Sequence, residues 1–246
     1  MSGHSKWANI KRKKAKVDAA KGSTFSRLTK EVTSAARQGG PNPDTNFKLR
    51  LAVARARDAN VPLSNIERAI QRAQGSGDGQ SLDEVLYEGY GPGSAAILLE
   101  ILTDNRNRTA GEIRHLFSRH GGNLGESGSV QWMFDQVGLA VVPETDGVTE
   151  ERVLEVALEA GADDVRREDG EYWILAGPEV LESVNQALER SGLPVERAEV
   201  TRLPQTSVEV SGEEADRLLR LLDLLDEHDD VQRVYSNADI PDESDL

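Results

Sequence analysis

The sequence predicts an α+β protein: an N-terminal three-helix domain followed by two ferredoxin-like α/β domains, the second inserted into the first. Three observations support this prediction. Apolar residues recur at helical spacing over the first 75 of the 246 residues, and strand and helix patterns alternate in the remainder. Within that remainder, residues 138–203 show the order βαββαβ, which is typical of a ferredoxin-like sandwich.

Three amphipathic segments make up the N-terminal part. A stripe of apolar residues over 24–39 predicts the first helix, and Asn42-Pro43 provides a cap and a first-turn proline for the second. Ser64-x-x-Glu67 forms a capping box for the third. We therefore expect a basic flexible arm over residues 1–22 and a helical domain over 23–75.

A linker rich in glycine and serine at 75–81 precedes the alternating strands and helices. The first predicted elements are strands 85–90 and 95–102, a helix opened by the capping box Thr109-x-x-Glu112, and strand 130–134. The next are strand 139–142, helix 149–160, strands 164–167 and 172–175, helix 178–191 and strand 195–202. The last are strand 207–210, helix 215–225 and strand 231–235.

The last three elements are too few to form a domain of their own. We expect them to complete the sheet begun by residues 82–134, with strand 207–210 pairing with one of its strands. The predicted organisation after the linker is an α/β domain of 82–135 plus 205–237, an inserted domain of 138–203 and an acidic tail of 238–246.

Composition limits the classes of function. Cysteine is absent, which excludes disulfides, thiol catalysis and cysteine-bound metals. Mean hydropathy is -0.52, and no apolar run approaches the roughly 20 residues of a membrane span. The N-terminal residues lack the apolar segment of a secretory signal. We therefore expect a cytoplasmic monomer that contacts no membrane.

The net charge of -14 is unevenly distributed. Residues 1–75 contain 16 Lys and Arg against 5 Asp and Glu, and the rest of the chain contains 13 against 38. The N-terminal part thus carries +11 and the remainder -25, and no lysine follows Lys48. A basic segment on an acidic protein indicates contact with nucleic acid, whose phosphates it can neutralise.

The basic arm supplies most of the predicted nucleic-acid contacts. Its cations neutralise phosphates while Trp7 stacks on a base. The predicted contacts here are Lys6, Trp7, Lys11, Arg12, Lys13, Lys14, Lys16 and Lys21 in the arm, with Arg27 and Lys30 in the first helix. Two alternatives are a solvated extension anchored by Trp7 and Ile10, and a nuclear-localisation signal at residues 11–14.

Four arginines form a second predicted contact: Arg106, Arg108, Arg114 and Arg119. They are the only Lys or Arg residues between positions 76 and 139, and the first two lie at the start of a predicted helix. Cations there oppose the helix dipole, which favours an interpretation in which they bind a phosphate together with free backbone N–H groups. The alternative is a set of ion pairs with Asp104, Glu112 and other acidic residues.

The sequence shows no pattern of a catalytic, cofactor or metal site. The segment HGGNLGESGS at 120–129 lacks the Gly-Lys-Ser/Thr of a Walker loop and precedes a predicted strand, so we interpret it as turns. The four histidines lack metal-ligand spacing, and the acidic clusters fall on predicted turns and helix ends. We expect a non-enzymatic protein whose acidic domains bind a protein partner, with a Mg²⁺-dependent nuclease as the catalytic alternative.

Three segments carry a resemblance to a known family. GHSKWANIKRKKAKVDAAKG, LTDNRNRTAGEIRH and GGNLGESGSV resemble the hallmark segments of the YebC/PmpR family, and the similarity spans nearly the whole chain. The resemblance implies a helical N-terminal domain with two α/β domains, and the function of a DNA-binding transcriptional regulator. Relatives include the mitochondrial translational activator of cytochrome c oxidase and proteins linked to ribosomes stalled on proline-rich sequence. The alternative function is therefore a ribosome-associated translation factor that binds ribosomal RNA.

Overall fold

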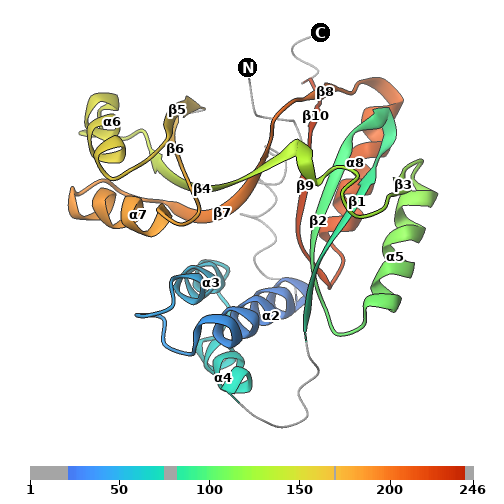
Figure 1. The fold of residues 1–246 in the computed structure, drawn as a ribbon, viewed down its shortest axis with the longest axis horizontal. Coiled ribbons are helices and arrows are strands. Elements are labelled where there is room, and N and C mark those ends of the chain that lie inside the picture. The colour runs from blue at the N-terminus through green and yellow to red at the C-terminus, as the bar shows by residue number, and fades with distance from the viewer. Residues whose placement is uncertain (1–21, 75–81, 169, 242–246) are drawn as a thin grey trace. The chain divides into compact units, whose positions relative to one another are not determined.

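The structure of the protein is a computed structural model that describes residues 22–74, 82–168 and 170–241 (Figure 1). Residues 1–21 of the predicted arm and the linker 75–81 lie outside these ranges. The chain divides into two compact units, one formed by the described parts of 1–133 and 204–246 and the other by those of 134–203. The fold is α+β, as the sequence predicts, with helices first and sheets after them.

Three helices form the N-terminal part of the first unit: α2 (Gly22–Gly39), α3 (Phe47–Asp58) and α4 (Leu63–Gln74). They pack around an aliphatic core that includes Val32, Leu49 and Ile66. Such a small core agrees with the aromatic content of the chain, which is only 4%.

Two of these helices start at residues other than the predicted ones. The cap of α3 is Asn46 and not Asn42, because the Asn46 side chain accepts a first-turn N–H and also donates to the carbonyl of Ala35 at 2.9 Å. A contact with α2 thus selects the cap. α4 begins at Leu63, directly after a proline, so Ser64 lies inside the helix and caps nothing.

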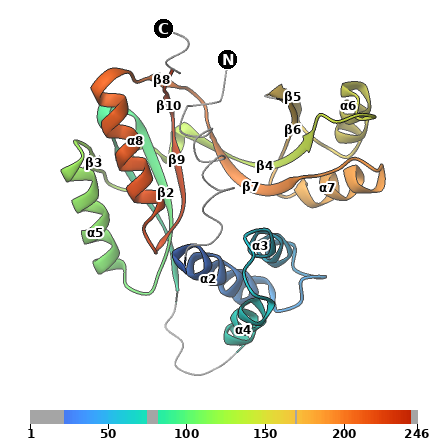
Figure 2. The ribbon, with the colours of Figure 1, turned by 180° about the vertical axis from the view of Figure 1, so that it is seen from behind.

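The rest of the first unit is a four-stranded sheet in the order β3-β1-β2-β9. Its elements are β1 (Asp83–Tyr90), η1 (Pro92–Ser94), β2 (Ala96–Thr103), α5 (Arg106–Arg119), β3 (Asn123–Leu124), α8 (Gly212–Asp226) and β9 (Val231–Ser236). β1 and β2 form a hairpin, β3 pairs antiparallel with β1, and β9 pairs antiparallel with β2. Both α5 and α8 pack on the same face of this sheet (Figure 2).

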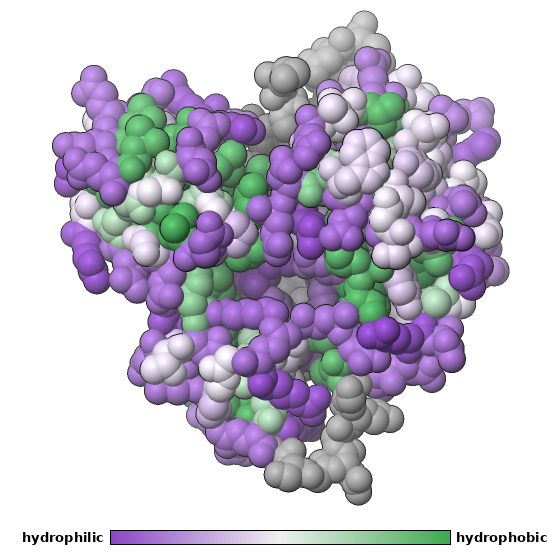
Figure 3. All heavy atoms as spheres, viewed as in Figure 1, coloured by the Kyte–Doolittle hydropathy of each residue, from purple (hydrophilic) through white to green (hydrophobic). Residues whose placement is uncertain are grey.

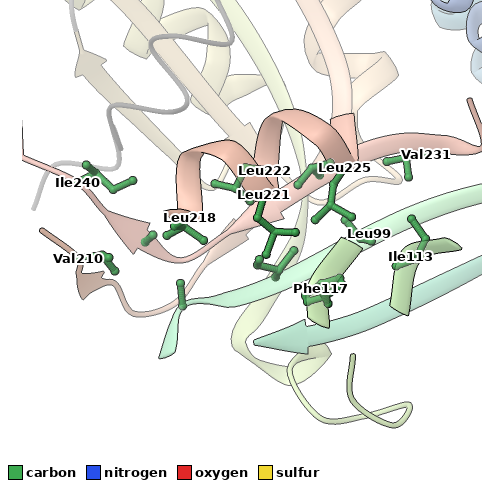
Figure 4. Packing of buried hydrophobic residues seen from close by; sticks show 14 of the residues in the cluster. Leu99, Ile113, Phe117, Val210, Leu218, Leu221, Leu222, Leu225, Val231 and Ile240 are labelled. Carbon is green, nitrogen blue, oxygen red and sulfur yellow. The ribbon is translucent and has the colours of Figure 1, made fainter. Parts of the chain in front are cut away.

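The core of this part lies between the sheet and its two helices. Leu99 from β2, Phe117 from α5 and Leu221 from α8 meet there and are fully buried (Figure 4). Burial of apolar surface stabilises the fold by roughly 25 cal/mol per Å². This packing fixes the rotation of α5 about its own axis and therefore decides which of its residues face outward.

The expectation for strand 207–210 is wrong, although β9 does join β2 as expected. β8 (Val208–Glu209) pairs in parallel with β10 (Ala238–Asp239) and with no described strand of 82–134. The buried Asn237 explains the difference. Its side-chain oxygen accepts the backbone N–H of Ala96 at 2.8 Å, so the chain leaves the sheet at this point and runs beside β8.

The second unit has the ferredoxin-like element order that the sequence predicts. Its elements are β4 (Phe134–Pro143), α6 (Glu150–Glu159), β5 (Asp164–Glu168), β6 (Glu171–Ala176), α7 (Leu181–Arg190) and β7 (Arg197–Pro204). The strands lie in the order β5-β6-β4-β7, and β6 is antiparallel to both β4 and β5. β4 and β5 are therefore parallel to each other, as expected for two strands joined by a helical crossover.

Residues 130–134 do not form the predicted strand. They contain a 3-10 turn, η2 (Gln131–Met133), and β4 starts only at Phe134. The cause is the buried carboxylate of Glu88 on β1, which accepts three backbone N–H groups of residues 128–131 at 2.7 to 2.8 Å. N–H groups bound to a side chain cannot take part in a strand ladder.

Hydrophilic residues cover most of the surface seen in Figure 3, with apolar residues in smaller patches between them. Charged side chains, which are 29% of the chain, account for this pattern. Among the described helices, none is long and apolar enough to cross a bilayer.

Replacing the Glu88 carboxylate tests whether it holds the loop before β4. We expect Glu88→Gln to lower the free energy of unfolding by about 1–3 kcal/mol, because an amide nitrogen then faces backbone N–H donors that lose their acceptor. Urea unfolding followed by circular dichroism measures the change. Glu126→Gln, at an exposed position of the same loop, is the control, and equal stability of the two variants would contradict the assignment.

Candidate nucleic-acid interface

Eight predicted contacts lie in the arm, outside the described residues: Lys6, Trp7, Lys11, Arg12, Lys13, Lys14, Lys16 and Lys21. The other six are described: Arg27 and Lys30 on α2, and Arg106, Arg108, Arg114 and Arg119 on α5. The structure places these six cations in two settings. Four have acidic partners, and two are exposed without one.

Arg27 and Lys30 face the turn between α8 and β9. Arg27 Nη1 donates to the carbonyl oxygen of Asp226 at 2.8 Å, and Lys30 Nζ lies 2.7 Å from Oδ1 of Asp230. The two cations are three residues apart, which places them on one face of α2. They hold the helical part against the α/β part of the same unit, so a phosphate must compete with these partners to bind them.

Asp230 is the centre of this contact. Its side chain is only 4% exposed, and besides Lys30 it accepts from Thr109 Oγ1 at 2.7 Å and from Arg108 Nη2 at 2.9 Å. Burial by itself would raise the pKa of the Asp230 carboxyl, but the hydrogen bonds from these three side chains outweigh it and hold the pKa well below its ordinary value. One carboxylate thus joins α2, α5 and the turn that precedes β9.

The same carboxylate decides how α5 begins. Asn105 caps the helix by accepting from the backbone N–H of Arg108 at 3.1 Å, so Thr109 lies inside the helix and is not its cap. Thr109 is fully buried, and its hydroxyl contacts both Asp230 and Thr103. Thr109, the predicted cap, therefore forms a buried polar contact, because Asp230 binds its hydroxyl.

His228 extends this network toward the surface of α5. Its Nδ1 accepts the backbone N–H of Asp230 at 3.1 Å, which assigns the ring proton of the neutral imidazole to Nε2. Nε2 lies 3.0 Å from Oε2 of Glu112, the only acidic residue of α5. Glu112 is thereby engaged by the α8–β9 turn.

A pocket of about 500 Å³ opens beside this network. The residues that line it are Lys30, Arg108, Glu112, Glu227, His228, Asp229 and Asp230. Four carboxylates face two cations there, so negative charge prevails and disfavours a phosphate in this pocket.

Arg106 is paired at the surface of the molecule. Its Nε lies 2.9 Å from Oδ2 of Asp83, and 58% of its side chain is exposed. Arg108 contacts Asp104 at 3.0 Å in addition to Asp230. The ion pairs required by the alternative interpretation are therefore present for both of these arginines.

Arg114 and Arg119 differ from the other four cations. Both are exposed on α5, and neither has an ion-pair partner within the described part of the chain. A phosphate can reach them without breaking an existing contact. They are the predicted contacts of α5 that the structure leaves most accessible.

Three further exposed arginines were not among the predicted contacts. Arg57 at the end of α3 and Arg68 and Arg72 on α4 have no carboxylate partner among the residues described. Arg68 and Arg72 are one turn apart and lie on the same side of α4. The signal is present in the sequence, since two cations at i and i+4 oppose the apolar stripe of an amphipathic helix.

The segment at 120–129 is only partly turns, because Asn123–Leu124 form the short strand β3. At its end, Glu88 accepts the backbone N–H of Gly128 and those of Val130 and Gln131 that follow, so these groups are not available to a phosphate. In the three described ranges, no three His, Asp or Glu residues are grouped so that they could hold a metal ion.

Two family descriptions match the chain and together cover most of it. Residues 5–76 match "TACO1/YebC protein N-terminal domain", and residues 82–238 match "TACO1/YebC second and third domain". The chain therefore belongs to the TACO1/YebC family.

Relatives are similar over nearly the whole length. A "Probable transcriptional regulatory protein" of Carboxydothermus hydrogenoformans is 53% identical over 244 residues, which are 98% of this chain and 100% of the relative. A similarly named protein of Symbiobacterium thermophilum is 54% identical over 236 residues, 96% and 98% of the two chains. The crystal structure of "a Conserved Hypothetical Protein Aq1575 from Aquifex Aeolicus" is 46% identical, with a TM-score of 0.81 over 92% of this chain and 93% of that chain. The two relatives are named for regulation of transcription and for no catalytic reaction.

Substitution of Asp230 tests its role at the junction of α2, α5 and β9. We expect Asp230→Asn to lower the free energy of unfolding at neutral pH by about 3 kcal/mol, because Lys30, Arg108 and the buried Thr109 hydroxyl lose the carboxylate that binds them. The wild-type carboxyl has a lower pKa in the folded than in the unfolded chain, so its contribution is present at neutral pH and is lost as the pH falls below about 4. Urea unfolding at several pH values measures both effects. Asp229→Asn, at the exposed neighbouring position, is the control, and an equal loss in both variants would contradict this role.

Arg106 pairs with the partly exposed Asp83, whereas Arg108 pairs with the buried Asp230, so their removal should affect stability differently. We expect Arg108→Ala to lower the melting temperature by several degrees, because the buried Asp230 loses one of its partners. Arg106→Ala should leave the melting temperature unchanged, because an ion pair between exposed side chains contributes little. Differential scanning calorimetry distinguishes the two variants, and equal melting temperatures would show that the contact with Asp230 adds no stability.

Proposed function

We propose that the protein regulates transcription by binding DNA through its basic N-terminal part. The observation that carries the proposal is the division of charge, +11 over residues 1–75 and -25 over the remainder. The names of the two relatives support a regulatory role. In this proposal the protein acts in the cytoplasm as a monomer, and it performs no catalytic step.

The helical part contributes exposed cations in support of this proposal. It contains nine Lys and Arg against four Asp and Glu over residues 22–74. Arg57, Arg68 and Arg72 have no carboxylate partner in the described chain, so contact with a phosphate breaks no ion pair there. Each phosphate neutralised releases bound counterions, which favours binding at low salt.

The acidic remainder favours one direction of approach. A charge of -25 repels the DNA backbone, so the N-terminal part meets DNA first. Phosphate contacts supply affinity and position but no sequence information. Selection of particular genes then requires base contacts from the arm or a protein partner bound by the acidic units.

Removing positive charge from the arm tests the proposal through the salt dependence of DNA binding. We expect a variant with Lys11, Arg12, Lys13 and Lys14 all replaced by Gln to bind duplex DNA more weakly, with a salt slope reduced by up to about 4. The control replaces four cations of the acidic part by Gln: Arg152, Arg166, Arg190 and Arg217. Both variants change the net charge equally, so fluorescence anisotropy across a salt series separates local contact from overall charge. An unchanged slope in the arm variant would remove the arm from the mechanism.

A parallel measurement separates DNA from ribosomal RNA as the target. The wild-type protein is tested for retardation of promoter fragments and for co-sedimentation with ribosomes, both across the same salt series. Promoter binding at salt concentrations that release the ribosome supports regulation of transcription. Exclusive association with ribosomes would overturn the proposal in favour of a translation factor.

A further inference from the structure

Gly111 occupies the middle of α5, where glycine is a poor choice for the helix itself. Glycine has the lowest helix propensity of any residue except proline, and alanine has the highest. The backbone of Gly111 does not adopt a positive φ, and a Cβ built on it would meet no atom within 4 Å. Gly91 differs, because its Cβ would meet Leu218 and Ile97 in the core. Neither conformation nor internal packing therefore requires glycine at 111.

Gly111 lies at the centre of the exposed face of α5. Asn107, Arg114, His115 and Ser118 are one or two turns away on the same side, and all are exposed. The opposite side carries Thr109, Ile113 and Phe117, which are fully buried. Figures 1 and 2 show α5 at the outer edge of its unit, with no other described element of that unit beyond it. The middle of this polar surface therefore has no side chain, and nothing in the described unit covers it.

This face is positively charged in an acidic part of the protein. All four Lys and Arg residues between positions 76 and 139 lie on α5. Arg114 and Arg119 have no ion-pair partner in the described chain, and Glu112, the single acid of the helix, contacts His228. Two arginines that are unpaired in the described chain, against one carboxylate, leave this face with a net positive charge.

We propose that the exposed face of α5, centred on Gly111, is a second nucleic-acid contact that receives the sugar-phosphate backbone. Without a side chain at 111, the backbone of the ligand approaches the helix more closely by the depth of a side chain. Arg114 and Arg119 then reach phosphates beside the point of closest approach, and Asn107 and Ser118 offer hydrogen bonds. This inference rests on the proposed function, since it assigns another surface of the same protein to the same ligand.

The test compares binding with stability in variants of the full-length protein. The probes are a fluorescein-labelled duplex DNA and a labelled single-stranded RNA of the same sequence. We expect Gly111→Ala to bind the preferred probe several-fold more weakly while its melting temperature stays equal to or above that of the wild type, because alanine favours the helix. Gly111→Gln should weaken binding further, since its longer side chain fills the site. Ser183→Gln, at an exposed position of α7, is the matched control and should bind like the wild type.

Removal of charge provides a second, independent measurement. We expect Arg114→Ala to weaken binding and to reduce the salt slope by about 1. Arg220→Ala, which removes an exposed arginine of α8, is the control with the same change in net charge. It should leave the slope unchanged.

The outcomes separate this inference from the proposed function. In one outcome, the wild type binds a probe, the arm variant binds it more weakly, and Gly111→Ala and Gly111→Gln bind it like the wild type. The inference is then overturned and the proposed function stands. A lower melting temperature of Gly111→Ala would also overturn it, because the glycine would then serve the fold. If the wild type binds neither probe, the proposed function fails and the inference fails with it.

Discussion

The buried carboxylate of Asp230 is the interaction on which the arrangement of the first unit depends. A buried anion is tolerated only where cations and hydrogen-bond donors surround it. Here the donors come from separate elements: Lys30 from α2, and Arg108 and Thr109 from α5. The backbone of Asp230 also takes part, since its carbonyl accepts the N–H of Leu102 at the end of β2. The helical part and α5 are therefore both positioned on the sheet by one residue in the turn before β9.

Two buried carboxylates organise two of the segments that resemble a family hallmark. Asp230 holds the start of α5, within LTDNRNRTAGEIRH. Glu88 holds the loop GGNLGESGSV by accepting two of its backbone N–H groups and that of Gln131, which follows it. In both cases a negative side chain far away in the sequence satisfies donors that a local structure leaves unpaired. The acidic composition of the chain thus has a structural use besides its effect on net charge.

Nine cations of the described residues 22–74 and 82–133 fall into two groups with different consequences. Arg27, Lys30, Arg106 and Arg108 contact acidic residues or carbonyl oxygens and hold elements together. Arg57, Arg68, Arg72, Arg114 and Arg119 are exposed and have no acidic partner in the described chain. Within the described residues 22–74 and 82–133, the exposed arginines without an acidic partner therefore lie on α3, α4 and the outer face of α5. This division also explains why cations can sit at the start of α5 against the helix dipole: Asp83, Asp104 and Asp230 neutralise them.

The sequence by itself determined the order of the helices and of the longer strands, the α+β class and the uneven distribution of charge, because periodicity, turn residues and charge are local properties. It missed the two-residue strands β3 and β10, which are too short to show a periodic pattern. Only the tertiary structure decided which residue caps α3 and α5, why residues 130–134 form no strand, and where β8 pairs. Asn46 caps α3 because it also binds Ala35, and Thr109 is buried because its hydroxyl contacts Asp230, 121 residues away in the chain. The sequence also could not show which arginines of α5 have an acidic partner. Whether an arginine is paired or free depends on partners that only folding brings near, and no local pattern in the sequence records them.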